Sequence, residues 1–389
     1  MKTFPGLEGA RGWLAWAVVV WHLVQTTGTD TVIGRTYILG MIAAWSVEVF
    51  IIMSGFVITH LILSKKERYP TYITRRALRL FPAFLVALAA GILSFPLWFE
   101  TAASMEWLRP SRLELAQKLA AEYSDRFWTH VVAHISMLHG TIPNNILPQS
   151  QAMFLGPAWS ASLEWQFYLI APIVIWLTGR SWGIVTLISG TFVSVSLYNW
   201  GVFGDFMLPS VLTGAAHFFA FGIATRISWF VLPQLRAYPV AAVAMIAMTL
   251  FLSISFMPLV IWSALIAYTL VIDDAKASDR IQKSLSILLD SKIARAAGAR
   301  SYSVYILHMP VLIVGAYVGR VALSLGYLGT AAVTTIFATV GVLIASEVTY
   351  RFIELPAINL GKKIGKRRSL ATTSDDAPTH DDGVRVSQG

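Results

Sequence analysis

Residues 9–23 read GARGWLAWAVVVWHL, an apolar run with an arginine at its entry and a histidine eleven positions further along. Such a run is typical of a helix that crosses a lipid bilayer, which needs about 20 apolar residues. Eleven residues are about three helical turns, so Arg11 and His22 share one face, and His22 lies ~16 Å deeper. Ionisable groups at that depth are costly and usually face a cavity or a partner. His22 is therefore a candidate functional residue, and the alternative is a structural histidine that hydrogen-bonds across helices.

The composition of the whole chain agrees with a membrane location. Of the 389 residues, 56% are hydrophobic and 13% are charged, whereas a soluble domain carries roughly 25% charged residues. The fold class predicted is all-α, a polytopic membrane helical bundle. The net charge of +9 comes from short basic clusters between apolar stretches, which argues against a nucleic-acid partner. The absence of Cys excludes disulfides, thiolate metal sites and a cysteine nucleophile.

Hydropathy divides the chain into a membrane domain at 1–356 and a tail at 357–389. We expect about ten transmembrane helices, at residues 8–28, 40–64, 78–99, 157–178, 181–200, 208–230, 237–255, 257–272, 301–320 and 328–351. The segment 129–140 is apolar but too short to cross, and we interpret it as re-entrant or lying at the surface. The tail is polar and basic, then rich in Ser, Thr and Asp, so we expect it to be disordered.

The placement of lysine and arginine gives the orientation. With both termini on the cytoplasmic side of ten spans, most of the 30 basic residues fall on that side. The positive-inside rule favours this arrangement over the opposite one. The largest outer segment is then 100–156, and the tail is cytoplasmic.

Further ionisable groups lie within or beside the predicted spans. Glu48 is in the apolar core of the second span, where it is either functional or a buried partner for a basic residue. Arg75, Arg76 and Arg79 stand at the inner mouth of the third span, and their i,i+3 and i,i+4 spacing predicts one crowded face. Guanidinium groups suit phosphate, so this cluster indicates either a phosphate-bearing ligand from the cytoplasm or topology with anionic lipid.

Two more blocks carry polar residues into the membrane. The sequence WSASLEWQFY places Glu164 about two turns from the outer face, and SYSVYILHMP places His308 about two turns from the inner face. Tyr305 in the second block can hydrogen-bond across the bundle.

Five motifs in the same order resemble the acyltransferase-3 family, bacterial integral-membrane enzymes that O-acetylate cell-surface and exported polysaccharides. They are the arginine–histidine pair of the first span, EVFIIMSGFVIT, RRALR, WSASLEWQFY and SYSVYILHMP. The resemblance covers roughly residues 4–356. One departure is Glu48, where members of the family often carry Asp. Some members append an SGNH-type esterase domain, and we expect none here.

The resemblance implies acyl-CoA, usually acetyl-CoA, as co-substrate, with no tightly bound cofactor and no metal. It implies a polysaccharide or lipid-linked glycan acceptor and a location in the bacterial cytoplasmic (inner) membrane, among lipids and polysaccharide biosynthesis machinery. The phosphates of coenzyme A would lie at the arginine cluster, with the pantetheine arm running along the face of Arg11. His22 would act as general base, Glu164 would orient the acceptor or the histidine, and Glu48 would belong to the binding site. Tyr305 and His308 would bind the donor or stabilise charge on the thioester oxygen.

Two functions other than acyl transfer are compatible with parts of this pattern. A proton-coupled transporter could use His22, Glu48 and Glu164 as a relay, but we find no related halves and the cytoplasmic arginine cluster would be unexplained. A catalytically inactive scaffold within a polysaccharide synthase is the third hypothesis. The histidines at 130, 134 and 139 lack a metal-binding pattern with a nearby carboxylate, and we expect them to be interfacial residues in an outer lid that faces the acceptor.

Overall fold

The computed structural model describes residues 4–34, 36–65, 67–231, 256–272 and 280–375. Helices make up nearly all of this part of the chain, and no strand occurs within it. Five helical segments are long and apolar enough to cross a membrane: Tyr37–Lys65, Tyr69–Ser104, Gly156–Thr178, Lys283–Ala322 and Tyr327–Lys366. The prediction of an all-α, multi-pass membrane protein is thereby supported, while the number of spans and the side of each terminus stay predictions.

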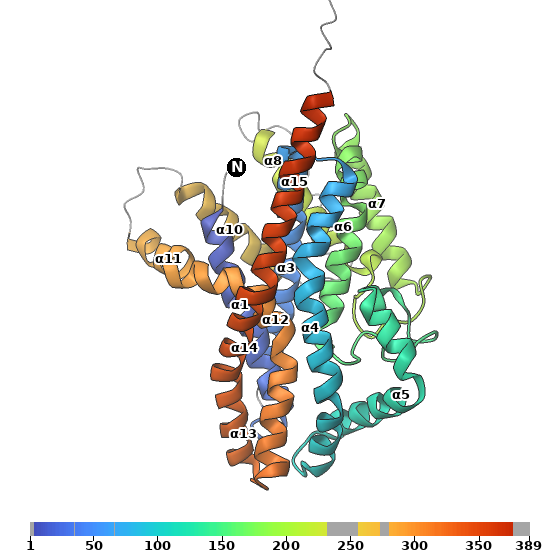
Figure 1. Cartoon of the computed structure of the whole chain (residues 1–389), viewed down its shortest axis with the longest axis vertical. Helices are drawn as coiled ribbons and strands as arrows, with labels where there is room; N and C mark the ends of the chain where they lie inside the picture. The colour runs from blue at the N-terminus through green and yellow to red at the C-terminus, as the bar shows by residue number, and fades with distance from the viewer. Residues whose placement is uncertain (1–3, 35, 66, 232–255, 273–279, 376–389) are drawn as a thin grey trace, which may run out of the picture.

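The helices follow the chain in a simple order (Figure 1). The first half contains α1 (Pro5–Thr26), α2 (Thr29–Val32), α3 (Tyr37–Lys65), α4 (Tyr69–Ser104), α5 (Pro110–Ile135), η1 (His139–Thr141), η2 (Gly156–Ala158), α6 (Trp159–Thr178) and α7 (Gly183–Asn199). The second half contains α8 (Leu212–Val231), α10 (Met257–Ile272), α11 (Arg280–Asp290), α12 (Lys292–Tyr317), α13 (Tyr327–Ile336), α14 (Val342–Thr349) and α15 (Leu355–Asp375). The π-helical turn η4 (Val318–Ala322) extends α12. Two further π-helical turns, η5 (Phe337–Gly341) and η6 (Tyr350–Glu354), join α13, α14 and α15 into one long helical rod. The predicted span at 237–255 lies outside the described residues.

Helices α1 and α12 lie side by side and run in the same direction. Their backbones touch, because a Cβ atom added to Gly298 would lie 1.8 Å from the carbonyl oxygen of Glu8. A Cβ atom added to Gly12 of α1 would likewise lie 3.0 Å from the amide nitrogen of Gly298, and ten residues beyond these two glycines His22 meets His308. Small residues allow such close approach between membrane helices, and here they set which residues of the two helices stand at the same level.

Helices α3 and α8 form a second parallel pair. A Cβ atom added to Gly222 would lie 2.0 Å from the carbonyl oxygen of Ile52 and 2.7 Å from the amide nitrogen of Phe56. The rings of Phe167 on α6 and Phe219 on α8 stack at 4.1 Å between centroids. This packing holds α3, α6 and α8 together, and α3 and α6 supply much of the lining of the internal cavity described below.

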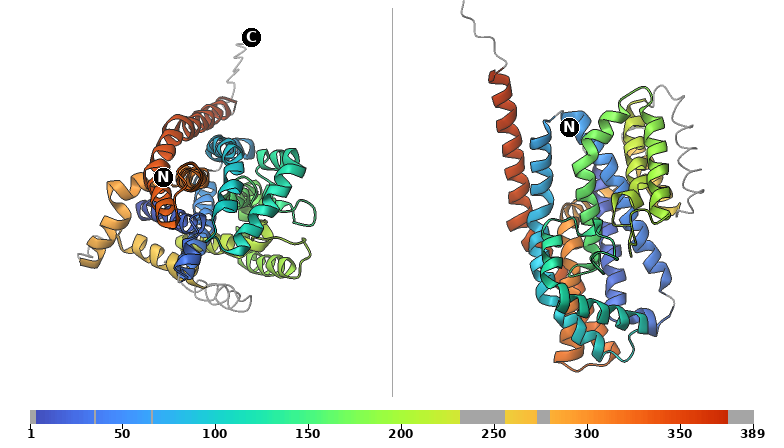
Figure 2. Two further views of the ribbon diagram at one scale, coloured as in Figure 1. Left: turned by 90° about the horizontal axis from the view of Figure 1, so that it is seen from below. Right: turned by 90° about the vertical axis from the view of Figure 1, so that its right-hand side faces the viewer.

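The two ends of the molecule differ (Figure 1; Figure 2). At the end where the N-terminus lies, α15 extends past the neighbouring helices. At the opposite end, α5 lies across the bundle, and its backbone leaves helical geometry at Arg126 (φ −131°, ψ 28°). The helix therefore consists of two arms, one near the end of α1 and one that rises beside α4.

The tail contains more helix than the sequence predicted. Residues 357–375 continue α15, and Gly361 and Gly365 pack against the side chain of Arg75 on α4. This contact gives the polar segment a surface to lie on, which composition alone does not reveal. Residues 376–389 lie outside the described part, and the domain boundary stays a prediction.

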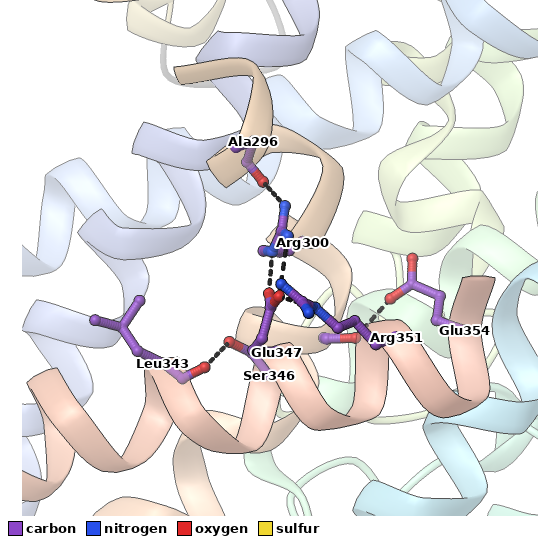
Figure 3. Close-up of polar contacts among 8 residues, drawn as sticks. Ala296, Arg300, Leu343, Ser346, Glu347, Arg351 and Glu354 are labelled. Atoms are coloured by element: carbon purple, nitrogen blue, oxygen red, sulfur yellow. Dashed lines mark hydrogen bonds and ion pairs between the residues drawn. The ribbon is translucent and has the colours of Figure 1, made fainter. Parts of the chain in front are cut away.

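Ion pairs tie α12 to the last helical rod (Figure 3). The carboxylate of Glu347 accepts hydrogen bonds from Arg300 on α12 and from Arg351 one turn further along its own rod, with Arg300 Nη2 at 3.1 Å from Oε1. Arg300 also donates to the carbonyl oxygen of Ala296 at 2.9 Å. These contacts fix α12, and with it Tyr305 and His308, against the C-terminal helices.

Candidate functional site

His22 and His308 form a direct contact in the interior of the bundle. Nδ1 of His22 lies 2.9 Å from Nε2 of His308, and the two rings stack with centroids 5.0 Å apart. His308 is fully buried, whereas His22 is half-buried, and its Nε2 makes no hydrogen bond with any described residue. The contact uses one nitrogen of His22 and leaves the other available to a substrate.

A cavity of about 120 Å³ lies on one side of this pair. Its polar lining comes from five helices and consists of Arg11, Ser54, Arg76, Arg79, Ser160, Glu164, Tyr168, Ser301, Tyr302 and Tyr305. Apolar residues, mostly of α3, close the remaining wall. The cavity therefore joins three guanidinium groups to hydroxyl groups inside an apolar bundle.

The arginines of α4 do not all face this cavity. Arg76 and Arg79 line it, with Arg76 lying over the ring of Tyr168 at 5.7 Å. Arg75 instead forms an ion pair with Glu67, and it packs against α15 as described above. Helical spacing predicted one crowded face, but Glu67 and the glycines of α15 draw Arg75 to the other side.

Arg79 is held by a fully buried carboxylate. Glu354, with no exposed side-chain surface, forms an ion pair with Arg79 and accepts a hydrogen bond from Ser303 Oγ at 2.5 Å. The guanidinium also lies 5.8 Å from the centre of the Tyr302 ring. Arg11 has neither an ion pair nor a hydrogen bond among the described residues, although it lines the same cavity.

Glu164 lies in the cavity wall on the side of the arginines. Its Oε1 accepts hydrogen bonds from Tyr168 on the next turn of α6 and from Ser54 on α3 at 3.3 Å. Its charge also acts on Arg11 and Arg79. The structure thus brings Glu164 together with the arginines rather than with the histidine pair.

Tyr305 and Ser160 stand between the cavity and the histidines. Their hydroxyl groups are 2.8 Å apart, and Tyr305 also donates to the carbonyl oxygen of Pro157 at 3.0 Å. The ring of Tyr305 lies 6.0 Å from that of His308, one turn further along α12. The cavity therefore ends beside the two histidines.

Glu48 belongs to neither group. It is largely buried on α3, its Oε2 makes no hydrogen bond with the described residues, and it does not line the cavity. No hydrogen-bonded chain in the described part of the molecule joins His22, Glu48 and Glu164. The three side chains therefore form no directly hydrogen-bonded relay within the described residues.

The histidines at 130, 134 and 139 are fully buried, so the expectation that they are interfacial is wrong. The rings of His134 and His139 stack at 4.0 Å, and Phe154 packs against His134 at 5.2 Å. Phe154 arrives from the loop before α6, which the sequence pattern could not place over them. In the described residues no group of three His, Asp or Glu side chains is arranged to hold a metal ion.

Burial of these histidines predicts sensitivity to acid. Desolvation lowers the pKa of His134 from 6.5 to about 4 and that of His139 well below 6.5. As pH falls from 6.5 towards 4 the unfolded chain binds protons that the folded chain does not, so stability is lost in that window. For His134 the expected loss at pH 5 is about 2 kcal/mol.

The melting temperature of the purified protein, followed by tryptophan fluorescence, should therefore fall between pH 7 and pH 5. His134→Gln cannot titrate and should show a smaller fall than the wild type. Equal melting temperatures of the wild type at both pH values would contradict this prediction.

Several residues of the site were not singled out from the sequence. Ser54, Tyr168 and Tyr302 line the cavity, and Glu354 holds Arg79. Ser54 lies in the SGF motif, and Tyr168 and Tyr302 lie in WSASLEWQFY and SYSVYILHMP, beside the ionisable Glu164 and His308. Glu354 is an acidic residue just after the last predicted span, and this position could have marked it as a partner for a basic residue.

Comparison with known proteins finds similarity to two acyltransferases, OatA and MdmB. The chain is 23% identical over 397 aligned residues to the O-acetyltransferase OatA of several Staphylococcus aureus strains, an alignment that covers 93% of this chain and 58% of OatA. It is 29% identical over 175 residues to the acyltransferase MdmB of Streptomyces mycarofaciens, covering 43% of this chain and 38% of MdmB. The chain thus spans little more than half of the length of OatA. No solved structure matches it.

A family model described as an acyltransferase domain matches residues 4–350, which include the cavity-lining residues, both histidines of the central pair and the α1–α12 contact. The match extends over nearly the whole of the chain and agrees with the five motifs and their order. The chain therefore belongs to the acyltransferase-3 family.

Proposed function

We propose that this protein is a membrane-embedded O-acyltransferase that moves an acetyl group from acyl-CoA to a hydroxyl of a polysaccharide or its lipid-linked precursor. The observation that carries the proposal is the cavity that runs from three guanidinium groups to the neighbourhood of the His22–His308 pair. Such an arrangement suits a long substrate with phosphates at one end and a reactive carbonyl at the other.

The donor would enter from the end where the arginines lie. Arg11, Arg76 and Arg79 offer guanidinium groups to the phosphates of coenzyme A, since arginine forks match phosphate geometry. Arg11 and His22 are separated by ~16 Å along α1, a length that suits the extended pantetheine arm. Glu164 balances the positive charge of the arginines and holds Tyr168 and Ser54 in the wall.

His22 would act as the general base, and His308 would orient it. We assign the proton of His22 to Nδ1, which then donates to Nε2 of His308 at 2.9 Å. The proton of His308 would then be on Nδ1, a buried atom that makes no hydrogen bond with the described residues. Nε2 of His22 then carries a free lone pair, as a general base requires.

The reaction is written as direct transfer. Nε2 of His22 takes the proton of the acceptor hydroxyl while its oxygen attacks the thioester carbonyl carbon. A C–O bond forms, the C–S bond breaks, and the thiolate of coenzyme A takes the proton from His22. At the end of the cavity, Ser160 would turn its hydroxyl away from the carbonyl oxygen of Pro157, which Tyr305 also binds, and donate to the developing oxyanion.

The printed name of OatA, an O-acetyltransferase, supports an acetyl group and a hydroxyl acceptor. The proposal includes a location in the bacterial cytoplasmic membrane, where membrane lipids and polysaccharide biosynthesis machinery would be partners. The apolar helical segments support the membrane location.

The donor site is tested with purified protein in nanodiscs and radiolabelled acetyl-CoA. Arg76→Gln removes a charged group that lines the cavity, and we expect about 10- to 100-fold weaker acetyl-CoA binding, as for a charge-assisted hydrogen bond. Arg75→Gln is the matched control, because it removes the same charge from the adjacent position outside the cavity. Equal binding by the two variants would contradict the donor site, and no acetyl-CoA binding by the wild type would refute the proposed function.

A further inference from the structure

A second charged region lies beyond His22, on the side away from the arginine cavity. The short helix α2 follows α1 there, and Asp30 within it is buried, with only 4% of its side chain exposed. Arg109, at the start of α5, donates to the backbone oxygen of Asp30 at 3.2 Å and lies 3.7 Å from its Oδ2. Trp107 donates to the carbonyl oxygen of Thr27 at 2.9 Å, which fixes the start of α5 against the end of α1.

Arg112 adds a cation to this region without a partner of its own. It stands in the first turn of α5, and its side chain makes neither a hydrogen bond nor an ion pair with the described residues. Its backbone amide donates to the carbonyl oxygen of Arg109 at 2.8 Å, so Arg112 stands one turn after the residue that contacts Asp30. Oδ1 of Asp30 is buried and makes no hydrogen bond with the described residues either. Largely buried charges without hydrogen bonds are costly, and a ligand that joins them would offset that cost.

The order of groups along α1 and α2 separates two substrates. Arg11 lies in the donor cavity, His22 follows three turns later on α1, and Asp30 comes eight residues after His22, on α2. If coenzyme A fills the cavity side, the acceptor hydroxyl must reach Nε2 of His22 from the side of α5. Two arginines and one aspartate leave this second region with a net positive charge.

We propose that Arg112, together with the Arg109–Asp30 pair, forms an acceptor subsite that binds an anionic group of a saccharide, a carboxylate or a phosphate, close to the hydroxyl to be acylated. This inference rests on the proposed function and adds the class of the acceptor to it. Arg112 supplies the charge, and the unpaired oxygen of Asp30 accepts a hydrogen bond from a neighbouring hydroxyl of the sugar. A neutral saccharide would satisfy Asp30 and leave Arg112 without a partner.

The test measures release of coenzyme A and labelled acetyl transfer by the nanodisc-embedded protein with three probe sugars. Methyl glucoside is neutral, methyl glucuronoside carries a carboxylate, and glucose 1-phosphate carries a phosphate. We expect at least one anionic sugar to be preferred over methyl glucoside by about 10- to 100-fold in kcat/KM, the effect of one charged hydrogen bond. A preference for the carboxylate indicates an acidic polysaccharide as the source, and a preference for the phosphate indicates a phosphate-linked precursor.

Arg112→Gln should abolish the preference without changing the KM for acetyl-CoA and without lowering the melting temperature. Lys118→Gln is the matched control, since Lys118 lies on the same helix and is well exposed, with 59% of its side chain accessible. An equal response of the wild type to charged and neutral sugars, including no response to any, would overturn the subsite, as would a preference that survives in Arg112→Gln. If the wild type does not bind acetyl-CoA, the proposed function itself is refuted.

Discussion

Replacing His22 with glutamine is expected to lower acyl transfer by about 10²- to 10⁴-fold, the contribution typical of a positioned general base. In the wild type, Nδ1 of His22 lies 2.9 Å from Nε2 of His308. Glutamine keeps a hydrogen-bonding group near this position, but it cannot take a proton from the acceptor. Because His22 does not line the arginine cavity, acetyl-CoA binding should be unchanged. Single-turnover transfer and equilibrium binding of labelled acetyl-CoA, measured on the same preparation, separate the two effects.

A matched comparison distinguishes the two histidines. His308→Gln should lower the transfer rate less than His22→Gln, because His308 orients the base and does not touch the acceptor hydroxyl. Glu48→Gln is the control, since Glu48 is an ionisable residue of the membrane interior outside the cavity, and it should retain full transfer. Transfer that survives in His22→Gln, or that is lost equally in Glu48→Gln, would contradict the assignment of the base.

Glu354→Ala should destabilise the folded protein by about 2–4 kcal/mol, towards the lower part of the range for breaking a buried ion pair. The substitution removes the partner of Arg79 and an acceptor for Ser303 from a site with no exposed carboxylate surface. The cavity leaves 19% of the Arg79 side chain exposed, which moderates the cost. Melting temperature and the yield of monodisperse protein measure the effect.

The double variant Arg79→Met/Glu354→Leu gives the decisive contrast. Replacing both charges by apolar groups of similar size is often close to neutral, so the double variant should melt at a higher temperature than Glu354→Ala. It should also bind acetyl-CoA more weakly than the wild type, because one guanidinium of the cavity is gone. A Glu354→Ala protein with the melting temperature of the wild type would show that the pair does not contribute to stability.

The sequence predicted the all-α class and the membrane location because both follow from local properties, namely long apolar segments separated by basic clusters. It also identified His22 and His308 separately, each as an ionisable residue inside an apolar helix. Their contact could not be predicted, because it depends on how α1 and α12 are aligned, and that alignment is set by the backbone contact between Glu8 and Gly298.

The arginine cluster shows where local spacing fails. The i,i+3 and i,i+4 rule describes positions on a bare helix, and it correctly brought Arg76 and Arg79 to one cavity. It could not include Glu67, which precedes the helix and pairs with Arg75. The prediction for the histidines at 130, 134 and 139 failed for the same kind of reason, since Phe154 packs against His134 from a distant loop.

The backbone contact between α1 and α12 also has a mechanical meaning. Two helices whose main chains touch cannot slide past each other without first separating, so His22 and His308 move as parts of one body. Widening of the interior for a long substrate must then come from helices outside this body. Helix α4, which carries Arg76 and Arg79, and α6, which carries Ser160 and Glu164, line the cavity from outside this body. On the proposed function, His22 would keep its orientation while these walls adjust to admit and release substrates.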